Sequence, residues 1–591
     1  MAKVLARTYL SPTLVLLAFD WPDGKDHADF LGFAIKRDPG HGEEGRPDFL
    51  FNKIAFHPLT SGERPHPSDR APIQKFHWWD AGIETKDRGR QFSYTIYPVR
   101  GTGEHDLRLV PEDATTVQVK VPREEENGVG TYFNRAVVSS QGFLSYARKV
   151  NGDLDKEMEW LANGLGDAIS RFLDGAHDVV GAIYHLTDKK WVVPVLGQMV
   201  GTLSMVYHLK QTSSGKNDDT TNLPAVKLLA SPKRRFEKRT RTAIMHHKFL
   251  VRDVDGPAAG VLMGSTNFTP EAFTAQANLL HTFRSPQMAQ LYKARHDLLA
   301  PDPPKGQTAQ GAAWHDVNDV SGTKIRVFLS PEPTKKRVSI DAVVKAVQAA
   351  QQSVLFCLFA PTDPALLKAL LAAGDKKKMM YGLLNSIQDP TKPRKETVLD
   401  PQAATLAAKA RYQVQTEVFH RSKGQHDVVA FDYFHEGRAP RGFLPELSAI
   451  NTSAKSLKPP SDKVPTVHVH HKFIVIDGET KNPTIYTGSA NMSDNSVHNN
   501  DENLLEITGN TRLAEVYVAE FLRLYEHYRT RAIWEQEHNP KRGAKTPRAK
   551  RKSGHGATAF VLKTNRKAWV GDAYKPGMLD FIARKQLVAP A

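Results

Sequence analysis

The first 125 residues alternate between short apolar runs and clusters rich in Pro, Gly and Asp. Runs at 13–19, 91–97 and 116–121 have the length of strands and are rich in Val, Thr, Tyr and Phe. No helical periodicity of comparable strength interrupts them. We therefore predict an all-β, sandwich-like N-terminal domain over residues 1–125, with an acidic, turn-rich linker at 122–130.

After the linker, apolar spacing changes to a mixture of helical and strand periods. Apolar residues three and four positions apart predict an amphipathic helix over 157–174. Apolar runs at 179–186 and 203–209 predict strands, and the segment 191–200 between them can be helical. A strand, a crossover and a second strand make a βαβ unit, which implies a parallel sheet covered by helices.

The same order of elements recurs in the second half. Ser339 is placed to cap a helix over 340–351, and a strand at 353–359, a helix at 364–373 and a strand at 379–384 follow. This repetition indicates an internal duplication. The predicted domains after residue 125 are a first lobe at 135–320, a second lobe at 321–537, a basic linker at 538–558 and a short C-terminal segment at 559–591.

Composition excludes several classes of protein. The single cysteine, Cys357, rules out internal disulfides and Cys-rich metal sites, and we expect it to be a buried apolar thiol. No run of about 18 apolar residues is present, and Arg7 and Asp20 interrupt any signal-peptide core. We expect a cytoplasmic protein, and peripheral attachment to a membrane surface is compatible with this expectation.

The net charge of +16 suits an anionic partner such as nucleic acid, a phospholipid surface or a phosphorylated metabolite, although it also fits a merely soluble basic protein. Two segments concentrate the charge. The run 233–241 leads into the histidine motif described next and could hold a polyanion or a headgroup layer, and 541–552 could be a tether or a plain linker.

Each half ends in a segment that matches the other. The first reads Met245-His-His-Lys-Phe-Leu-Val-Arg-Asp253 and then Gly264-Ser-Thr-Asn267; the second reads Val469-His-His-Lys-Phe-Ile-Val-Ile-Asp477 and then Gly488-Ser-Ala-Asn491. The two copies lie 224 residues apart in one register. Such a match is very improbable by chance, so we interpret it as a duplicated site.

Strand alternation predicts the geometry of that site. His246 and Lys248 share one face, as do His470 and Lys472, whereas His247 and His471 face the other way and are expected to be structural. Two halves meeting across a pseudo-twofold would bring together two imidazoles, two ammonium groups and the amides of Asn267 and Asn491.

That set of groups fits cleavage of a phosphodiester. Ammonium and amide groups can stabilise the phosphate oxygens, one imidazole can attack phosphorus, and the other can protonate the leaving oxygen and then activate water. Asp253 and Asp477 could orient the imidazoles, and no metal or other cofactor is required. A zinc cluster of His468, His470, His471 and His498 is an alternative, but it leaves the first copy unexplained.

The duplicated segment resembles the HxKxxxxD…GSxN motif of the phospholipase D superfamily, and with the repeated element order the resemblance covers roughly residues 135–535. It implies two α/β/α sandwich lobes related by a pseudo-twofold, with the site between them and a covalent phosphohistidine step. The N-terminal histidine is the nucleophile in many members, which implies His246 as nucleophile and His470 as general acid. The implied site residues are His246, Lys248, Asp253, Ser265, Asn267, His470, Lys472, Asp477, Ser489, Asn491 and Glu502.

Glu502 enters that set because Asn500–Glu502 resembles an extension that often follows the motif. Aligning Asn278–Leu280 with Asn503–Leu505 places Ala277 opposite Glu502, so the two halves are not equivalent. Further segments, among them 133–141, resemble bacterial phospholipase D-like proteins.

The resemblance leaves the substrate open. Two motifs in one chain favour a phospholipase or transferase acting on a phospholipid headgroup ester. The His-His-Lys-Phe form of the motif and the basic charge favour a nuclease. A non-catalytic binding protein with a degenerate site is a third hypothesis, opposed by the intact His and Lys of both copies. Because both half-sites lie in one chain, a monomer suffices to complete the site.

Overall fold

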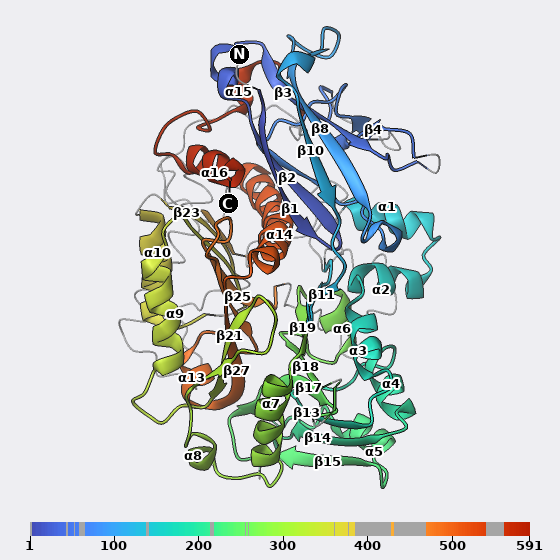
Figure 1. Cartoon of the computed structure of the whole chain (residues 1–591), viewed down its shortest axis with the longest axis vertical. Coiled ribbons are helices and arrows are strands. Elements are labelled where there is room, and N and C mark those ends of the chain that lie inside the picture. Colours follow the sequence, from blue (N-terminus) through green and yellow to red (C-terminus); the bar gives the residue numbers. More distant parts are fainter. Residues whose placement is uncertain are drawn as a thin grey trace.

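The structure is a computed structural model that describes residues 3–42, 45–52, 54–57, 65–136, 141–212, 215, 218–254, 256–257, 259–359, 361–375, 378–384, 427–430, 469–538 and 561–590. Figure 1 shows the N-terminal strands at one end of the molecule and two larger sheets with their helices at the other.

Two antiparallel sheets make up the N-terminal region. One has the order β1 (Leu5–Ser11), β2 (Leu14–Asp20), β7 (His77–Asp80); the other has the order β10 (Thr115–Lys120), β8 (Gln91–Arg100), β3 (Phe30–Asp38), β4 (Asp48–Phe49), with β9 (Arg108–Leu109) beside β8. β5 (Phe51–Asn52) pairs with β6 (His66–Pro67), and short 3-10 helices lie at Pro22–Asp26, Thr85–Asp87 and Pro111–Asp113. The predicted β-rich character of this region is confirmed.

The first half of the duplication forms an eight-stranded sheet. Its order is β11 (Glu125–Glu126), β12 (Val129–Phe133), β19 (Leu279–Arg284), β18 (Gly260–Gly264), β17 (Lys248–Arg252), β13 (Asp178–Ile183), β14 (Thr202–His208), β15 (Arg234–Arg239). The second half repeats this order strand for strand: β20 (Trp314–Val317), β21 (Lys324–Ser330), β27 (Asn500–Thr508), β26 (Thr484–Gly488), β25 (Lys472–Ile476), β22 (Ser353–Leu358), β23 (Met379–Leu384), β24 (Asp427–Ala430).

Strand directions also repeat, and they confirm the parallel strands of the predicted βαβ units within mixed sheets. Only the last three strands of each order run parallel, β13–β14–β15 and β22–β23–β24, and the rest pair antiparallel. The parallel neighbours β13–β14 and β22–β23 are joined by helical crossovers, whereas the motif strands β17–β18 and β25–β26 are joined by short hairpins.

Helices cover the outer face of each sheet. α3 (Leu165–Leu173), α4 (Val192–Gln198) and α5 (Leu223–Leu229) pack on the first sheet, and α9 (Val338–Ala349) and α10 (Pro364–Asp375) pack on the second. The remaining helices of this part are α1 (Gln141–Lys149), α2 (Leu154–Ala162), α6 (Pro270–Thr274), α7 (Pro286–Leu299), α8 (Lys305–Thr308), α13 (Asp494–His498) and α14 (Thr511–His538).

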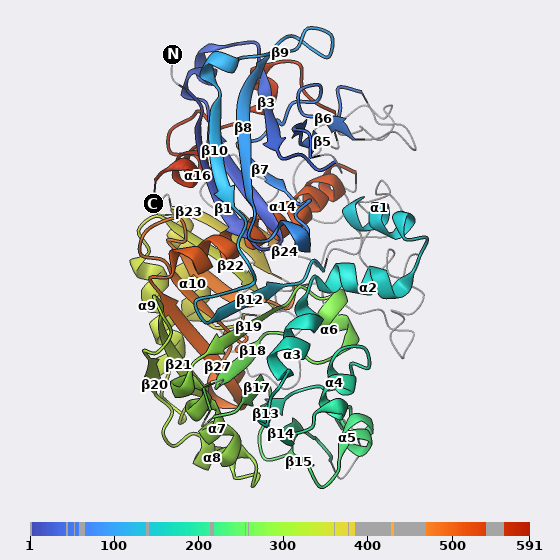
Figure 2. The same cartoon turned by 45° about the vertical axis from the view of Figure 1, so that its right-hand side comes forward.

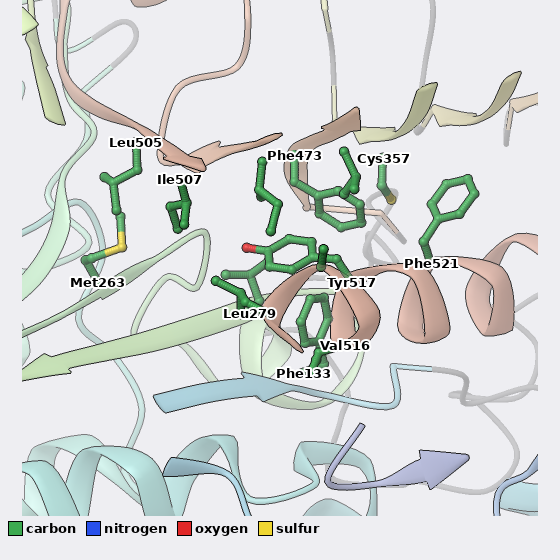
Figure 3. Packing of buried hydrophobic residues seen from close by; sticks show 14 of the residues in the cluster. Phe133, Met263, Leu279, Cys357, Phe473, Leu505, Ile507, Val516, Tyr517 and Phe521 are labelled. Carbon is green, nitrogen blue, oxygen red and sulfur yellow. The ribbon is translucent and has the colours of Figure 1, made fainter. Parts of the chain in front are cut away.

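A continuous apolar core lies between the two sheets and includes residues of α7 and α14. Tyr517 of α14 packs edge-on against Phe473 at 4.9 Å and Phe133 at 5.2 Å between ring centroids, and Figure 3 shows these rings together. Cys357, also drawn there, is fully buried in β22, as expected for an apolar thiol. The two halves are therefore joined by ordinary hydrophobic packing.

The C-terminal segment returns to the N-terminal sheets. α15 (Arg566–Trp569) contacts β3 and α16 (Leu579–Val588) contacts β2, and Figure 2 shows α16 beside the N-terminal strands. Trp569 donates from its indole nitrogen to the carbonyl of Phe30 at 2.8 Å, and Arg584 forms an ion pair with the buried Asp20. The predicted basic linker, including 541–552, lies outside the described residues apart from its first residue.

Three local predictions are wrong. The expected helix over 157–174 is two helices, α2 and α3, because Asn163 and Gly164 take left-handed conformations with φ of 52° and 85°. Ser339 lies inside α9 rather than at its cap, and its hydroxyl donates to Glu332. The expected linker at 122–130 forms β11 and β12 at the edge of the first sheet.

Candidate active site

The two motifs meet because the residues just before each motif pair with the sheet of the other half. The short strand β16 (Ile244–Met245) runs parallel to β27, and Val469 bridges to Ala277 in the same way. The backbone N–H of His246 donates to the carbonyl of Asp501 at 2.9 Å, and that of His470 donates to Ala277 at 3.0 Å. Each histidine is therefore fixed by the strand that follows the other half's motif.

This exchange corrects the alignment of the halves after the motif. Met245 pairs with Asp501 and Val469 with Ala277, so a constant offset of 224 residues relates the copies beyond the motif itself. Asn278 is therefore the counterpart of Glu502, and the sequence alignment that set Ala277 against Glu502 was one position out. The unbroken 224-residue offset was the signal that could have identified Asn278.

The lysines take matching positions. Lys248 donates from Nζ to the carbonyl of His246 at 2.7 Å, and Lys472 donates to the carbonyl of His470 at 2.8 Å. Each ammonium also lies 5.2 Å from an aromatic ring centre, that of Tyr184 in the first half and that of Phe359 in the second. Sequence analysis did not single out these two aromatics, although each directly follows a central strand, β13 or β22.

The imidazoles differ in what lies at Nδ1. His470 has the side-chain oxygen of Asn278 at 2.9 Å, and that oxygen also accepts from Ser265 while the amide nitrogen donates to the carbonyl of Ala272. The amide orientation is thus fixed, so Nδ1 of His470 carries the proton and Nε2 is left for a ligand. His246 has instead a carboxylate oxygen of Glu502 at 3.2 Å, an ion-pair distance without hydrogen-bond alignment.

Burial dominates the electrostatics of this centre. Burial lowers the pKa of both His246 and His470 well below the usual value, and the charges of Lys248 and Lys472 lower each further. Because each histidine feels the lysine of the other motif, the two motifs form one electrostatic centre. The side chains of His246 and His470 are almost closed to solvent, with the residues 5% and 6% exposed.

Burial shifts the pKa of each remaining ionisable group toward its neutral form. Burial lowers the pKa of Lys472 to about 7 and, with the charge of Lys472, lowers that of Lys248 well below its usual range. Burial raises the pKa of Glu502 to about 7, against the opposing effect of its hydrogen bond from Asn500 and of the two lysines. The centre thus lacks negative charge to match its buried amines, which favours an anionic ligand.

The serines of the motif support neighbouring strands, whereas its asparagines line the site. The hydroxyls of Ser265 and Ser489 accept backbone N–H groups of β19 and β27 at 3.1 and 2.9 Å, so they brace neighbouring strands. The side-chain oxygens of Asn267 and Asn491 are buried and have no hydrogen-bond partner among the described residues. Buried amide oxygens without a partner at equivalent positions are typical of groups that meet a ligand.

The two motif aspartates do not contact the imidazoles, contrary to the expectation that they orient them. Asp477 lies at the far end of β25, where its carboxylate accepts backbone N–H groups of Gln351, Gln352 and Ser353 at 2.6 to 3.1 Å. Asp253 accepts those of residues 177 and 178 at 2.8 and 3.0 Å. Both residues therefore tie the turn that leads into β13 or β22, and the first residue of that strand, to the end of the motif strand.

Part of the basic run 233–241 is structural. Arg239 is fully buried and pairs with Asp501 at 2.8 Å, and Arg295 holds the other oxygen of the same carboxylate at 2.9 Å. Arg234 donates to carbonyls at the C-terminal end of α4. Arg235 and Lys238 remain exposed on β15, so only part of the run is available to a polyanion.

The alternative zinc cluster is not assembled in the described residues. His498 bonds through Nδ1 to Asp494 and through Nε2 to the carbonyl of Lys336, and no group of three metal-binding side chains is found there. His468 lies outside those residues. In the same part of the chain, no helix combines the length and apolarity needed to cross a bilayer.

Comparison with known proteins agrees with this description. A sequence profile described as "Cardiolipin synthase, PLD-like domain" matches residues 343–525, and a search of curated protein sequences found no match. Similar solved structures include a phosphatidylserine synthase from Haemophilus influenzae Rd KW20, with 12% identity over 62% of this chain and 85% of that one, at a TM-score of 0.42.

Two others are the phospholipase D family member Nuc from Salmonella typhimurium and yeast tyrosyl-DNA phosphodiesterase. Nuc has 16% identity over 35% of this chain and 95% of its own, with a TM-score of 0.20. The yeast enzyme has 12% identity over 57% and 86%, with a TM-score of 0.31. Scores this low carry no argument about substrate. The profile match identifies residues 343–525 as a phospholipase D-like domain, and the first half repeats the motif and strand order of that half.

Proposed function

We propose that this protein is a phosphodiesterase that acts through a covalent phosphohistidine, with no metal or cofactor in the reaction. One observation carries the proposal: two buried imidazoles of equivalent position, in a shared cationic centre, have different groups at Nδ1, Glu502 for His246 and Asn278 for His470. A nucleophile and a general acid need that kind of difference.

His246 is the proposed nucleophile. When its Nε2 attacks phosphorus the ring gains positive charge, which the carboxylate of Glu502 at 3.2 Å stabilises. The bond from phosphorus to the leaving oxygen breaks as the bond to nitrogen forms, and protonated His470 gives that oxygen its Nε2 proton. An amide at Nδ1 stabilises imidazolium less than a carboxylate does, so His470 gives up this proton readily.

The second displacement reverses these roles. Neutral His470 takes a proton from water, or from an alcohol, which attacks phosphorus and releases His246. Lys248, Lys472 and the amides of Asn267 and Asn491 hold the phosphate oxygens in both steps. The negative charge of a bound phosphodiester also raises the pKa of groups that burial lowers, so substrate binding favours the charged forms of Lys248, Lys472 and the acid His470, whereas His246 attacks with a neutral Nε2.

The narrowest proposed substrate is a phospholipid headgroup ester, which the enzyme would hydrolyse or transfer to an alcohol. Two motifs in one chain and the lipid synthase named in the matching profile support this choice. A nuclease is the second candidate, because Arg235 and Lys238 stay exposed on β15, the edge strand of the first sheet. Phospholipid vesicles and single- and double-stranded nucleic acids, offered in parallel with EDTA, separate the two.

A good leaving group tests the mechanism apart from the natural substrate. Nitrophenolate departs without protonation, so with a p-nitrophenyl phosphodiester the variant His470→Ala should release one equivalent in a burst and then stop, with phosphate retained on His246. His246→Ala should give no burst, and each variant should lose at least about 1,000-fold in steady-state turnover.

His315→Ala, on the exposed edge strand β20, is the matched control and should behave as the wild type. Mass spectrometry of the quenched His470→Ala protein locates the phosphoryl group. Near wild-type turnover in both active-site variants, or a burst from His246→Ala instead, would overturn the assignment.

A further inference from the structure

A third histidine lies beside the site in the first half only. Ile183 pairs with Lys248 and Leu358 pairs with Lys472, so Tyr184 and Phe359 occupy equivalent positions after their strands. The next residue in the sequence is His185 in the first half and Ala360 in the second. The duplication therefore preserves the aromatic residue and differs at the position that follows it.

His185 is connected to the nucleophile through that aromatic. Its ring stacks on Tyr184 with 3.8 Å between centroids and an angle of 18°, and the ring of Tyr184 meets that of His246 at 5.2 Å and 63°. The charge of His185 also lowers the pKa of His246, after burial and the two lysines. The side chain of His185 is 22% exposed against 6% for His246, so it extends the site toward solvent on the His246 side.

A carboxylate holds the ring in place. Nε2 of His185 lies 2.8 Å from Oδ2 of Asp219, whose other oxygen accepts the backbone N–H of Thr221 at 3.2 Å. The backbone of Asp219 is itself paired twice with that of Lys210, at 2.8 and 3.0 Å. The pair with His185 lowers the pKa of Asp219 well below its usual range although burial acts the other way, so the carboxylate is ionised and accepts the Nε2 proton.

This arrangement leaves the second ring nitrogen for a ligand. No residue in the described part of the chain is hydrogen-bonded to Nδ1 of His185. A neutral ring with its proton on Nε2 accepts a hydroxyl hydrogen at Nδ1, and a protonated ring donates from Nδ1 to a phosphate oxygen. In either state of the ring, the ligand atom that suits Nδ1 is an oxygen.

We infer that His185, held by Asp219, determines specificity by binding a hydroxyl or phosphate oxygen on the substituent that stays on phosphorus. In-line attack by His246 sends the leaving group toward His470, so a residue reached from His246 through Tyr184 is placed to contact the retained substituent. This inference rests on the proposed function, and it assigns His185 to binding, with no part in the transfer of the phosphoryl group.

Three p-nitrophenyl phosphodiesters test it, all with the same leaving group. Their retained substituents are methyl, 2,3-dihydroxypropyl, and dihydroxypropyl bearing a terminal phosphate. His185→Ala should raise KM about tenfold for one or both of the oxygen-bearing substrates, as expected for one lost hydrogen bond, and change it less than twofold for the methyl ester. His185→Gln should recover part of the loss, and Asp219→Asn should reproduce part of it, with kcat nearly unchanged throughout.

The outcomes are distinct from those that test the reaction itself. Turnover of the methyl ester by wild type and its loss in His246→Ala establish the reaction independently of His185. A rise in KM confined to one oxygen-bearing substrate identifies hydroxyl or phosphate as the group bound. An equal loss on all three substrates, or no loss on any, overturns the inference. Circular dichroism of each variant confirms that it is folded.

Discussion

The first and second halves of the site carry the same motif in different surroundings. In both, the lysine binds the carbonyl of its own histidine, and its ammonium lies 5.2 Å from an aromatic ring. The partners at Nδ1 differ, since β27, which fixes His246, carries Glu502, whereas the segment just before β19, which fixes His470, carries Asn278. The backbone acceptors differ too: Asp501 is clamped by two arginines, whereas its counterpart Ala277 has no charge.

The motif therefore fixes the positions of the two imidazoles, and the residues beside Nδ1 make them chemically different. Identical strands place two imidazoles symmetrically, and symmetry alone would give two groups of equal basicity. In the proposed mechanism, one carboxylate in place of an amide makes one imidazole the better nucleophile and the other the better acid. Each of the following predictions exchanges or removes one member of a matched pair.

The largest expected effect comes from the two lysines. Lys248→Met and Lys472→Met should each lower kcat/KM by about 100-fold or more, because each removes a preorganised charge from the phosphate. Lys472→Met should also stabilise the protein at neutral pH, since burial lowers the pKa of Lys472 to about 7. The folded state therefore binds this proton less tightly than the unfolded state does.

The sign of the pH dependence follows from that difference. Below pH 7 the lysine is charged in both states and the full cost of burying it is present. Between pH 7 and the ordinary lysine pKa the unfolded state still holds the proton, so wild-type stability rises with pH. The gain in unfolding free energy of Lys472→Met should shrink over this range in urea titrations. A gain that stays constant to pH 10 would contradict a charged, buried Lys472.

A smaller effect is expected at the residues that make the halves unequal. Glu502→Gln should lower kcat by about 10- to 100-fold, because developing charge on His246 loses its carboxylate. Burial raises the pKa of Glu502 and lowers that of Lys472, each to about 7, and the active forms are the ionised carboxylate and the charged amine. Wild-type kcat/KM should therefore rise with pH as Glu502 ionises and fall as Lys472 loses its proton. The rise should be absent in Glu502→Gln.

The reciprocal change at Asn278 is the control for that prediction. Asn278→Asp places a carboxylate beside His470, so it should make His470 a weaker acid and slow substrates with poor leaving groups more than nitrophenyl esters. Equal slowing of both substrate types would show that Asn278 serves only to hold the strand. A double variant that swaps the two residues, Glu502→Asn with Asn278→Glu, should transfer the covalent phosphate from His246 to His470.

Much of this site could be predicted from the sequence, because the information is periodic. Strand alternation placed His246 beside Lys248, and repetition at 224 residues paired the two motifs. What lies across a sheet could not be predicted in the same way. The contact of Asn278 with His470 depends on the exchange of strands between halves, and the break of the helix at Asn163 depends on a local left-handed turn.

The roles of Asp253 and Asp477 show the same limit. Their fixed spacing from the histidines suggested an orienting carboxylate, yet a strand of five residues carries each aspartate to the opposite end of its motif strand. Sequence spacing within one strand gives distance along it, and the partners at its far end come from another part of the chain.

The smallest expected effect therefore separates these two aspartates from the catalytic groups. Asp477 accepts from three backbone amides and Asp253 from two, so Asp477→Asn should lower the free energy of unfolding by about 2 kcal/mol and Asp253→Asn by about 1 kcal/mol. Asparagine is the matched substitution because it tolerates the left-handed φ of 53° and 47° found at these positions. Urea unfolding measures the loss, and kcat per folded molecule should remain within twofold of wild type. A fall in kcat comparable to that of Glu502→Gln would instead mean that the aspartates influence the imidazoles through the motif strand. The distinction between residues that stabilise the fold and residues that act in the reaction would then fail.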